Sequence, residues 1–292
     1  MKHASPASTA STAPDSFSDS QASLAKRTIA DFGEQWSHYG DNSGWYGSLE
    51  MFKDILGPLA DCEEFRDKRV VDIGSGTGRI VLWLLAAEAR QVIALEPAPG
   101  AYQQLLENLK ASGQAARVEA LNIAGAQWQT DQPVDWVVSV GVIHHIPQPD
   151  AVLAAAWRAL RPGGRCIVWL YGQEGNSAYL AFITPLRAIT TRLPHLLLRT
   201  LVELAYWILS VYRLAARRWR LPLYDYIEHV LWPMPPDKRR LVIYDQLNPA
   251  YAKYYTQTEA EQLLARAGFS DVRTYHRHGY SWTVIGTKPP TT

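Results

Sequence analysis

Residues 70–79 read Val-Val-Asp-Ile-Gly-Ser-Gly-Thr-Gly-Arg. An apolar run reaches Asp72, and three glycines follow at alternate positions, Gly74, Gly76 and Gly78, where a helical pattern begins. Glycine permits positive φ and a close approach of the backbone to a ligand, and a helix N-terminus adds exposed N–H donors. The spacing is G-x-G-x-G, whereas dinucleotide-binding folds show G-x-G-x-x-G. The stretch predicts a ligand-binding loop between a strand and a helix, although a simple tight turn would also use glycines.

A second acidic residue ends the next apolar run. Glu96 follows residues 92–95 and stands 24 positions after Asp72. A carboxylate at the tip of a neighbouring strand can accept hydrogen bonds from both hydroxyls of a ribose, as in nucleotide-binding folds. The alternative is an exposed glutamate that merely ends a strand. Because the loop and Glu96 occur together, they favour a nucleotide-type site.

Short apolar runs alternate with helical patterns from residue 68 onward. Strands are expected at 69–73, 91–96, 117–121, 134–140, 164–171, 271–275 and 281–287. Helices are expected at 79–88, 102–111, 151–160 and 259–267. This alternation predicts a parallel sheet covered by helices on both faces. It stops over residues 176–255, which are rich in Leu, Arg and aromatic residues and are expected to form an inserted group of helices.

The chain outside this alternation divides by composition. The first 23 residues are mostly Ser, Thr, Ala and Pro, with no apolar core of a secretory signal, and are expected to be disordered. Helices are expected at 24–36 and 49–59. The predicted organisation is a disordered tail (1–23), an N-terminal helical lid (24–67), an α/β domain (68–175 and 256–292) and a helical cap (176–255).

Composition and charge restrict the partners. Hydrophobic residues make up 47% of the chain and charged residues 20%, which suits a globular protein with a substantial core. The formal net charge of +1 offers no field that would favour nucleic acid, so we expect no nucleic-acid partner. Cys62 and Cys166 match no metal-ligand spacing. They indicate reduced packing residues in a cytoplasmic protein, with no bound metal.

Two further motifs make the sequence recognisable. Residues 135–147 read Asp-Trp-Val-Val-Ser-Val-Gly-Val-Ile-His-His-Ile-Pro, and residues 159–164 read Ala-Leu-Arg-Pro-Gly-Gly. With the glycine loop and Glu96, they resemble the class I S-adenosylmethionine-dependent methyltransferases from about residue 32 to residue 288. The resemblance implies a Rossmann-like, doubly wound, mostly parallel seven-stranded sheet, with the cap inserted after strand five. It also implies S-adenosyl-L-methionine as the cofactor.

The resemblance implies a cofactor site spread over several strand ends. The residues expected there are Trp36, Tyr39, Asp72, Gly74, Ser75, Gly76, Gly78, Glu96, Pro97, Asn122, Ile123, Ala124 and Gly141. The loop at 72–78 would surround the methionine part, Glu96 would hold the ribose, and Pro97 would pack against the adenine. Backbone groups at 122–124 would read the adenine edge, although the family often has an acidic residue where this chain offers Asn and Ile.

Two positions in that set have separate expected roles. Gly141 would leave room beside the transferable methyl group. Trp36 and Tyr39 follow Phe32-Gly-Glu-Gln, an opening similar to that of many small-molecule members, in which such a helix folds over the cofactor. The alternative is that these aromatic residues only anchor a helix on the sheet.

The candidate catalytic groups follow strand four. Methyl transfer needs a base only if the acceptor carries a proton, as a hydroxyl does. His144 and His145 lie at the carboxyl edge of the sheet, where ligands bind in such folds. An ordinary histidine titrates near pH 6.5, which suits it to accept a proton, but either could instead cap a helix or bond to backbone. Asp245 is a further candidate in the insertion, as are, less specifically, His229, His276 and His278.

The acceptor is expected to contact the insertion. Residues 196–217 form an expected helix with an apolar stripe (Leu197, Leu201, Leu204, Ile208, Val211) and an opposite polar stripe (Arg199, Glu203, Ser210, Arg213, Arg217). Its apolar side must face the sheet domain, a second subunit in a homodimer, or a lipidic partner, and residues 180–220 hold seven arginines and one acid. Membrane-surface contact through residues 196–220 therefore stays open.

The favoured function is transfer of a methyl group to an oxygen of a small-molecule acceptor, such as a sugar or another metabolite. Alternatives are transfer to nitrogen or carbon, and a lipid-linked acceptor. A cofactor-binding protein without catalysis and a nicotinamide oxidoreductase are readings from other classes, and the glycine spacing opposes the latter.

Overall fold

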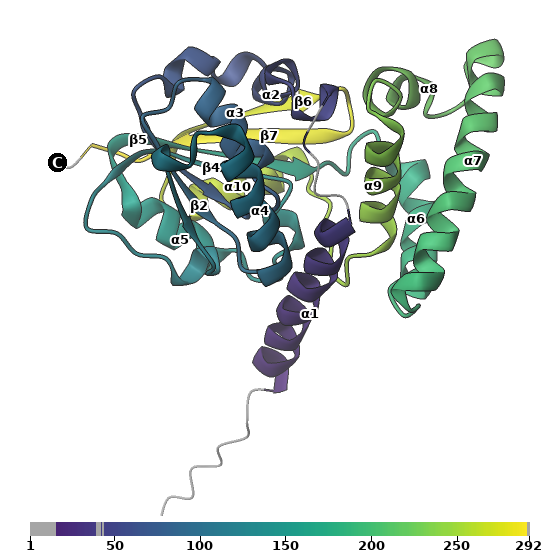
Figure 1. The fold of residues 1–292 in the computed structure, drawn as a ribbon, viewed down its shortest axis with the longest axis horizontal. Coiled ribbons are helices and arrows are strands. Elements are labelled where there is room, and N and C mark those ends of the chain that lie inside the picture. The colour runs from purple at the N-terminus through teal and green to yellow at the C-terminus, as the bar shows by residue number, and fades with distance from the viewer. Residues whose placement is uncertain (1–15, 39–41, 43, 291–292) are drawn as a thin grey trace, which may run out of the picture.

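The computed structural model describes residues 16–38, 42 and 44–290. Its centre is a seven-stranded sheet with the order β3-β2-β1-β4-β5-β7-β6 (Figure 1). The strands are β1 (Arg69–Ile73), β2 (Gln91–Leu95), β3 (Val118–Leu121), β4 (Val134–Val140), β5 (Leu160–Tyr171), β6 (Ser270–Arg277) and β7 (Ser281–Thr287). Strands β1 to β5 pair in parallel, and β7 runs antiparallel to both β5 and β6. The predicted fold class is confirmed.

Alternate side chains of the central strands build two cores. On one face, Val70 and Val138 pack with residues of α2 (Leu49–Leu56), α3 (Arg79–Ala86) and α4 (Pro99–Ser112). On the other face, Val71 and Val137 pack against α5 (Asp150–Ala159) and α10 (Gln257–Arg266). Both faces of these strands are covered, which explains why they read as nearly continuous apolar runs. Strand β1 lies next to β4, so the order of the strands along the sheet reverses direction between these two. Ligands bind at this point in such sheets.

The helices between β5 and α10 form a third cluster beside the sheet. They are α6 (Ser177–Thr190), α7 (His195–Trp219), the short α8 (Tyr224–Tyr226), the π-helical turn η7 (Ile227–Leu231) and α9 (Pro236–Leu247). Their own core includes Ile183, Val202 and Tyr244. In Figure 1, α9 lies nearest to the sheet and α7 lies on the far side of the group. We call these helices the cap.

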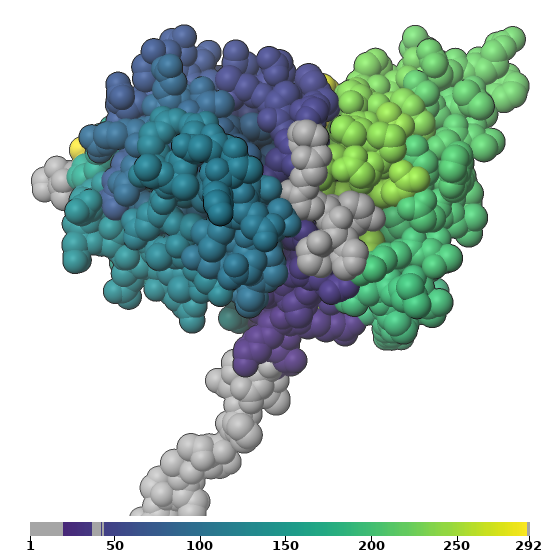
Figure 2. Space-filling model, viewed as in Figure 1, coloured from purple at the N-terminus to yellow at the C-terminus, as the bar shows by residue number. Residues whose placement is uncertain are grey.

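Helix α1 (Ser16–His38) joins the cap to the sheet domain. Asn248 at the end of α9 donates to the Asp31 carbonyl, and Arg199 of α7 pairs with Glu34 at 2.6 Å. On its other side, α1 packs against the start of α4, where a Cβ on Gly33 would lie 3.3 Å from the Cβ of Ala98. Figure 2 shows α1 between the two lobes. The N-terminal segment therefore lies where it can cover a site between them.

Some boundaries differ from those expected. Helix α1 begins at Ser16, so the prediction of disorder is wrong for residues 16–23, and the predicted helical start at residue 24 is eight residues late. The rest of the predicted tail lies outside the described residues. Strand β5 starts at Leu160 and includes the Arg-Pro-Gly-Gly turn. Among the described residues, no helix is long and apolar enough to cross a membrane.

Candidate active site

The glycine loop leaves β1 at the carboxyl edge of the sheet. Gly74, Gly76 and Gly78 all have positive φ, of 76°, 54° and 90°. At Gly74 a side chain is also sterically excluded, because a Cβ there would lie 2.5 Å from the Cγ2 of Val142. At Gly76 a Cβ would point at the ring of Trp36 at 3.6 Å. The loop therefore packs against α1 and the turn after β4. Its glycines leave the backbone without side chains on the side that faces the space between these two elements.

Glu96 follows β2 and is nearly buried beside this loop. Its Oε2 accepts from the backbone N–H of Gly76 and its Oε1 from that of Ala98, both at 2.8 Å. Burial raises the pKa of Glu96 to about 7. A carboxylate has about four acceptor positions, so two remain for further donors. Glu96 thus fixes the turn and still faces the cavity described below.

Asp72 lies beneath the loop with no solvent exposure. Its two carboxylate oxygens have no hydrogen-bond partner among the described residues. Burial raises the pKa of this carboxyl to about 7. A buried polar group without a partner is uncommon and costly, so it marks a place where a ligand can complete the bonding. A donor with positive charge, such as an ammonium group, fits it.

One cavity of about 1180 Å³ extends from this loop to the cap. Of the cofactor residues expected from the sequence, those lining it are Trp36, Gly74, Ser75, Gly76, Glu96, Pro97, Ala124 and Gly141. Asp72, Gly78, Asn122 and Ile123 do not line it. The amide of Asn122 instead donates to the Glu96 carbonyl at 2.7 Å, and Ile123 packs on the sheet core. Tyr39 lies outside the described residues.

The two histidines after β4 have different surroundings. His145 lines the cavity, and its Nδ1 lies 2.9 Å from the backbone carbonyl oxygen of Tyr251. A carbonyl can only accept, so Nδ1 carries the hydrogen and Nε2 keeps a free lone pair. Burial lowers the pKa of His145. The ring is therefore neutral near pH 7, with one nitrogen able to accept a proton.

His144 does not reach the cavity. It is fully buried, and its ring nitrogens have no hydrogen-bond partner among the described residues. Its ring packs against that of Tyr171 in a tilted arrangement, with 3.9 Å between the centroids. Burial holds its pKa well below the usual value. A neutral imidazole without contact to the cavity is suited to packing, so of these two histidines His145 is the one that lines the cavity.

Asp245 comes from α9 and faces the same cavity. Its Oδ2 accepts from the hydroxyl of Tyr171 at the end of β5, and its Oδ1 accepts from the Gln35 amide of α1 at 3.2 Å. Its negative charge raises the pKa of His145, although burial has the larger, opposite effect. Three separate elements therefore meet at this carboxylate, close enough to His145 to influence its charge.

A row of polar side chains continues from Asp245 along the cavity, and no sequence motif indicates it. Gln246 donates to Tyr171 at 3.0 Å and accepts from Tyr179 at 2.6 Å and from Tyr254 at 3.2 Å. Arg187 donates to the hydroxyl of Tyr254 at 3.2 Å. Burial raises the pKa of the Tyr171 hydroxyl well above its usual value. These groups form a hydrogen-bonding wall, with Asp245 at one end and Arg187 at the other, within a mainly apolar lining.

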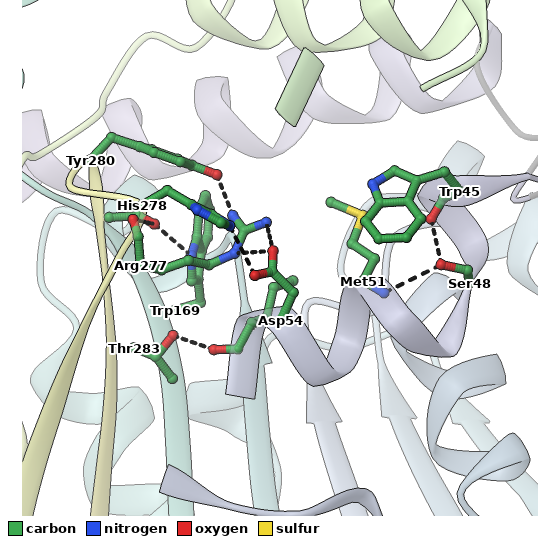
Figure 3. A network of polar contacts seen from close by, with 11 residues as sticks. Trp45, Ser48, Met51, Asp54, Trp169, Arg277, His278, Tyr280 and Thr283 are labelled. Atoms are coloured by element: carbon green, nitrogen blue, oxygen red, sulfur yellow. Dashed lines mark hydrogen bonds and ion pairs between the residues drawn. The ribbon is translucent and has the colours of Figure 1, made fainter. Parts of the chain in front are cut away.

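The remaining histidine candidates have structural contacts. Figure 3 shows Asp54 of α2 between Arg277 and His278, whose Nε2 lies 2.8 Å from Asp54 Oδ1. This network fastens α2 to the β6–β7 hairpin at the edge of the cavity. His276 stacks on Trp282, and His229 is exposed and lies near Asp225. The contacts of each of these histidines are structural, and none of them requires a catalytic role.

The fold and site define an α/β domain that binds a nucleotide-type ligand at the β1–β4 switch point. Comparison with protein families matches residues 70–164 to a methyltransferase domain. A tRNA 5-carboxymethoxyuridine methyltransferase of Escherichia coli is 25% identical over 52% of this chain and 59% of its own length. A ubiquinone biosynthesis O-methyltransferase of Idiomarina loihiensis is 25% identical over 50% of this chain and 60% of its own length. The chain thus spans about three fifths of these relatives.

Two solved structures share the fold across most of the chain. A 1,6-didemethyltoxoflavin-N1-methyltransferase of Burkholderia thailandensis, solved with S-adenosylhomocysteine, covers 97% of this chain and 94% of its own, with 15% identity and a TM-score of 0.51. An O-methyltransferase family protein from the same organism covers 85% of this chain and 57% of its own, with 12% identity and a TM-score of 0.53. The chain contains a class I S-adenosylmethionine-dependent methyltransferase domain, and its cofactor is S-adenosylmethionine.

Proposed function

We propose that the protein transfers a methyl group from S-adenosylmethionine to a hydroxyl oxygen of a small, largely apolar acceptor. The observation that carries this proposal is that one cavity is lined both by the glycine loop with Glu96 and by His145, whose Nδ1 is bonded to the Tyr251 carbonyl so that Nε2 is the nitrogen that can accept a proton. A base is required only for an acceptor that loses a proton during the reaction. A histidine at the cavity therefore favours a hydroxyl oxygen as the acceptor over an atom that carries no proton.

The cofactor residues have roles that follow from their contacts. Asp72 does not line the cavity, but its buried, unpartnered carboxylate lies directly beneath the glycine loop and places negative charge under the ammonium of the methionine part. Glu96 receives the ribose hydroxyls on the acceptor positions that Gly76 and Ala98 leave free. Trp36 covers the loop from α1. These assignments are our proposals, and Tyr39 keeps its expected role as a second lid residue.

The chain's own residues can carry the acceptor's half of the reaction. The cofactor supplies a methyl group on a sulfonium, a centre already activated for displacement. His145 Nε2 would take the proton of the acceptor hydroxyl, and Asp245 would stabilise the imidazolium that results. The O–CH3 bond would form as the S–CH3 bond breaks, with the thioether as the leaving group. Gln35 and Tyr171 hold the Asp245 carboxylate in position. The apolar lining and α1 exclude water and align the acceptor, which matters most when the leaving group is already good.

A small acceptor fits this cavity better than a nucleic acid does. Apolar residues of α6, α7 and η7 make up much of the lining beyond His145, and the net charge of the chain is only +1. Phosphate recognition needs clustered cations, whereas the arginines of this lining, Arg79, Arg220 and Arg277, come from separate elements, and Arg277 is paired with Asp54. We therefore retain the small-molecule proposal although some relatives are named for tRNA. A cytoplasmic location, in keeping with two buried free cysteines, stays part of the proposal.

The test is transfer of a labelled methyl group. The protein is incubated with methyl-labelled S-adenosylmethionine and three acceptor sets: hydroxylated apolar compounds, their amine counterparts, and unmodified tRNA. The proposal expects label on a hydroxylated compound and its loss in His145→Ala. Label on tRNA alone, or on amines with His145→Ala fully active, would contradict the oxygen assignment.

A further inference from the structure

The polar stripe of helix α7 forms ion pairs with neighbouring elements of the cap. Arg213 of this stripe pairs with Glu228 at 2.7 Å, and Glu203 pairs with Arg240 of α9 at 2.6 Å. The buried positions between them, such as Val202, pack on the core of the cap. Of the three partners left open for the apolar stripe, the sheet domain does not bury it, because Leu197, Leu204 and Val211 are exposed. A second subunit and a lipidic partner stay open.

The outward half of α7 is apolar along its whole length. Among the described residues, thirteen large hydrophobic side chains are exposed, and twelve of them lie within residues 182–223. The members on α7 are Leu196, Leu197, Leu201, Leu204, Trp207, Ile208, Val211, Leu214 and Trp219. Phe182 and Ile189 of α6 extend the set. We call this the α6–α7 face. Monomeric proteins rarely expose a contiguous apolar patch of this extent unless it binds something.

The α6–α7 face is continuous with the cavity. Phe182, Leu204 and Ile208 are 68%, 56% and 59% exposed, and the same three residues line the cavity that holds His145. An apolar path thus leads from the outer surface of the cap to the proposed base. Figure 2 shows the cap as a lobe beside the sheet domain. The exposure of these three side chains shows that the sheet domain does not cover them.

Exposed arginines stand at both ends of the face. Arg192 lies in the turn before α7, and Arg218 and Arg220 lie at its end. Of the seven arginines in residues 177–223, Arg199 pairs with Glu34, Arg213 and Arg217 lie beside Glu228, and Arg187 bonds to Gln246 and Tyr254. The surface charge at the ends of the face therefore comes from Arg192, Arg218 and Arg220. A helix with Leu and Trp on one side and basic residues beside it is the pattern of a segment that lies in an anionic membrane surface.

We propose that the α6–α7 face docks on an anionic lipid bilayer and that the acceptor enters the cavity from the bilayer. A second copy of the chain suits this surface less well. It would bring the arginines of two copies together, and it would close the path at Phe182, Leu204 and Ile208. A bilayer offers negative headgroups to the arginines and leaves the path open to an apolar molecule.

The second half of this proposal rests on the proposed function and narrows its substrate class. The acceptor is a hydroxylated molecule that partitions into lipid, with its apolar part along α6 and α7 and its hydroxyl at His145. Tryptophan is enriched at the water–lipid boundary because its side chain combines a large apolar ring system with a polar N–H group. Trp207 and Trp219, which are 63% and 66% exposed, occupy such positions on this face.

The experiment measures sedimentation with sucrose-loaded vesicles, without cofactor or acceptor, so its outcome does not depend on catalysis. The full chain is mixed with vesicles of phosphatidylcholine alone or with one part of phosphatidylglycerol to two parts of phosphatidylcholine. In the main variant Trp207, Val211 and Leu214 become Gln. These residues are exposed on the face and do not line the cavity. The control is Leu106→Gln, an exposed leucine of α4.

We expect the wild type and L106Q to bind the anionic vesicles alike, and the triple variant to bind at least about 30-fold more weakly, since three apolar side chains no longer enter the lipid. Replacing Arg192 and Arg218 with Gln should weaken binding to anionic vesicles about tenfold and leave phosphatidylcholine binding unchanged. Absence of wild-type binding, or equal binding by the triple variant, overturns the proposal. So does a dimer in analytical ultracentrifugation that the triple variant dissociates.

Discussion

The Oε2 atom of Glu96 lies 2.8 Å from the backbone nitrogen of Gly76, joining the tip of β2 to the glycine loop after β1. The loop can take this shape because Gly76 has a positive φ, and the carboxylate can approach because no side chain intervenes. The ribose acceptor and the loop that surrounds the methionine part are therefore one unit, and a change to either residue should affect cofactor binding through both.

Replacement of His145 by Ala should lower turnover by about 10²–10⁴-fold, because the proton acceptor is lost while the cofactor contacts are not touched. Rates are measured with the acceptor found in the labelling test, and S-adenosylmethionine affinity is measured alongside. His229→Ala, an exposed histidine outside the cavity, is the matched control. A loss below about threefold in His145→Ala would mean that alignment alone suffices or that the base lies elsewhere.

Replacement of Asp245 by Asn should shift the pH profile as well as the rate. Protonated His145 cannot act as a base, so kcat/KM falls as pH drops through the pKa of His145. Burial lowers this pKa and the charge of Asp245 raises it. Asn removes the raising contribution, so the acid limb should move to lower pH. An acid limb that stays in place or moves upward would show that Asp245 does not influence His145.

Two adjacent leucines test the orientation of α7. Leu198 is 1% exposed and belongs to the core of the cap, whereas Leu197 is 52% exposed on the α6–α7 face. Leu198→Ala should lower the free energy of unfolding by about 2–5 kcal/mol, and Leu197→Ala by less than about 0.5 kcal/mol, in urea titrations without lipid. A larger loss at Leu197 would show that its face is covered in solution.

The sheet could be predicted from the sequence because each strand is indicated by a pattern of consecutive residues. The apolar runs that became β1, β2 and β4 have the expected bounds to within one residue, since strands buried on both faces leave a continuous pattern. The glycine loop and Glu96 were identifiable for the same reason, because strand ends fix where they lie.

The cap could not be predicted in the same way. The apolar stripe at Leu201 and Ile208 was identified, but which side of α7 faces inward depends on partners far along the chain, such as Glu228 and Arg240. The polar wall has the same origin, because Gln246 and Tyr171 meet only when α9 packs beside β5. Asp245 was a candidate from the sequence, whereas Gln35 beside it carried no signal.

Cofactor affinity should depend on pH because two buried carboxyls must ionise. Burial raises the pKa values of Asp72 and Glu96 to about 7, so both hold protons in the free protein at lower pH. An ammonium group and two hydroxyl donors favour the charged forms. Affinity should therefore increase as pH rises from about 6 to about 7.5, with proton release on binding. Calorimetry in two buffers of different ionisation enthalpy measures that release, and proton uptake would contradict the assignment.

The most direct test of the central claim is calorimetric binding of S-adenosylmethionine to Glu96→Ala. Loss of a charged acceptor for two hydroxyls should cost about 2–3 kcal/mol, or about 30- to 150-fold in affinity. Glu119→Ala, which removes an exposed glutamate from β3, should bind as the wild type does. Thermal melting confirms that the variant is folded. Unchanged affinity in a folded Glu96→Ala protein would contradict the cofactor site described here.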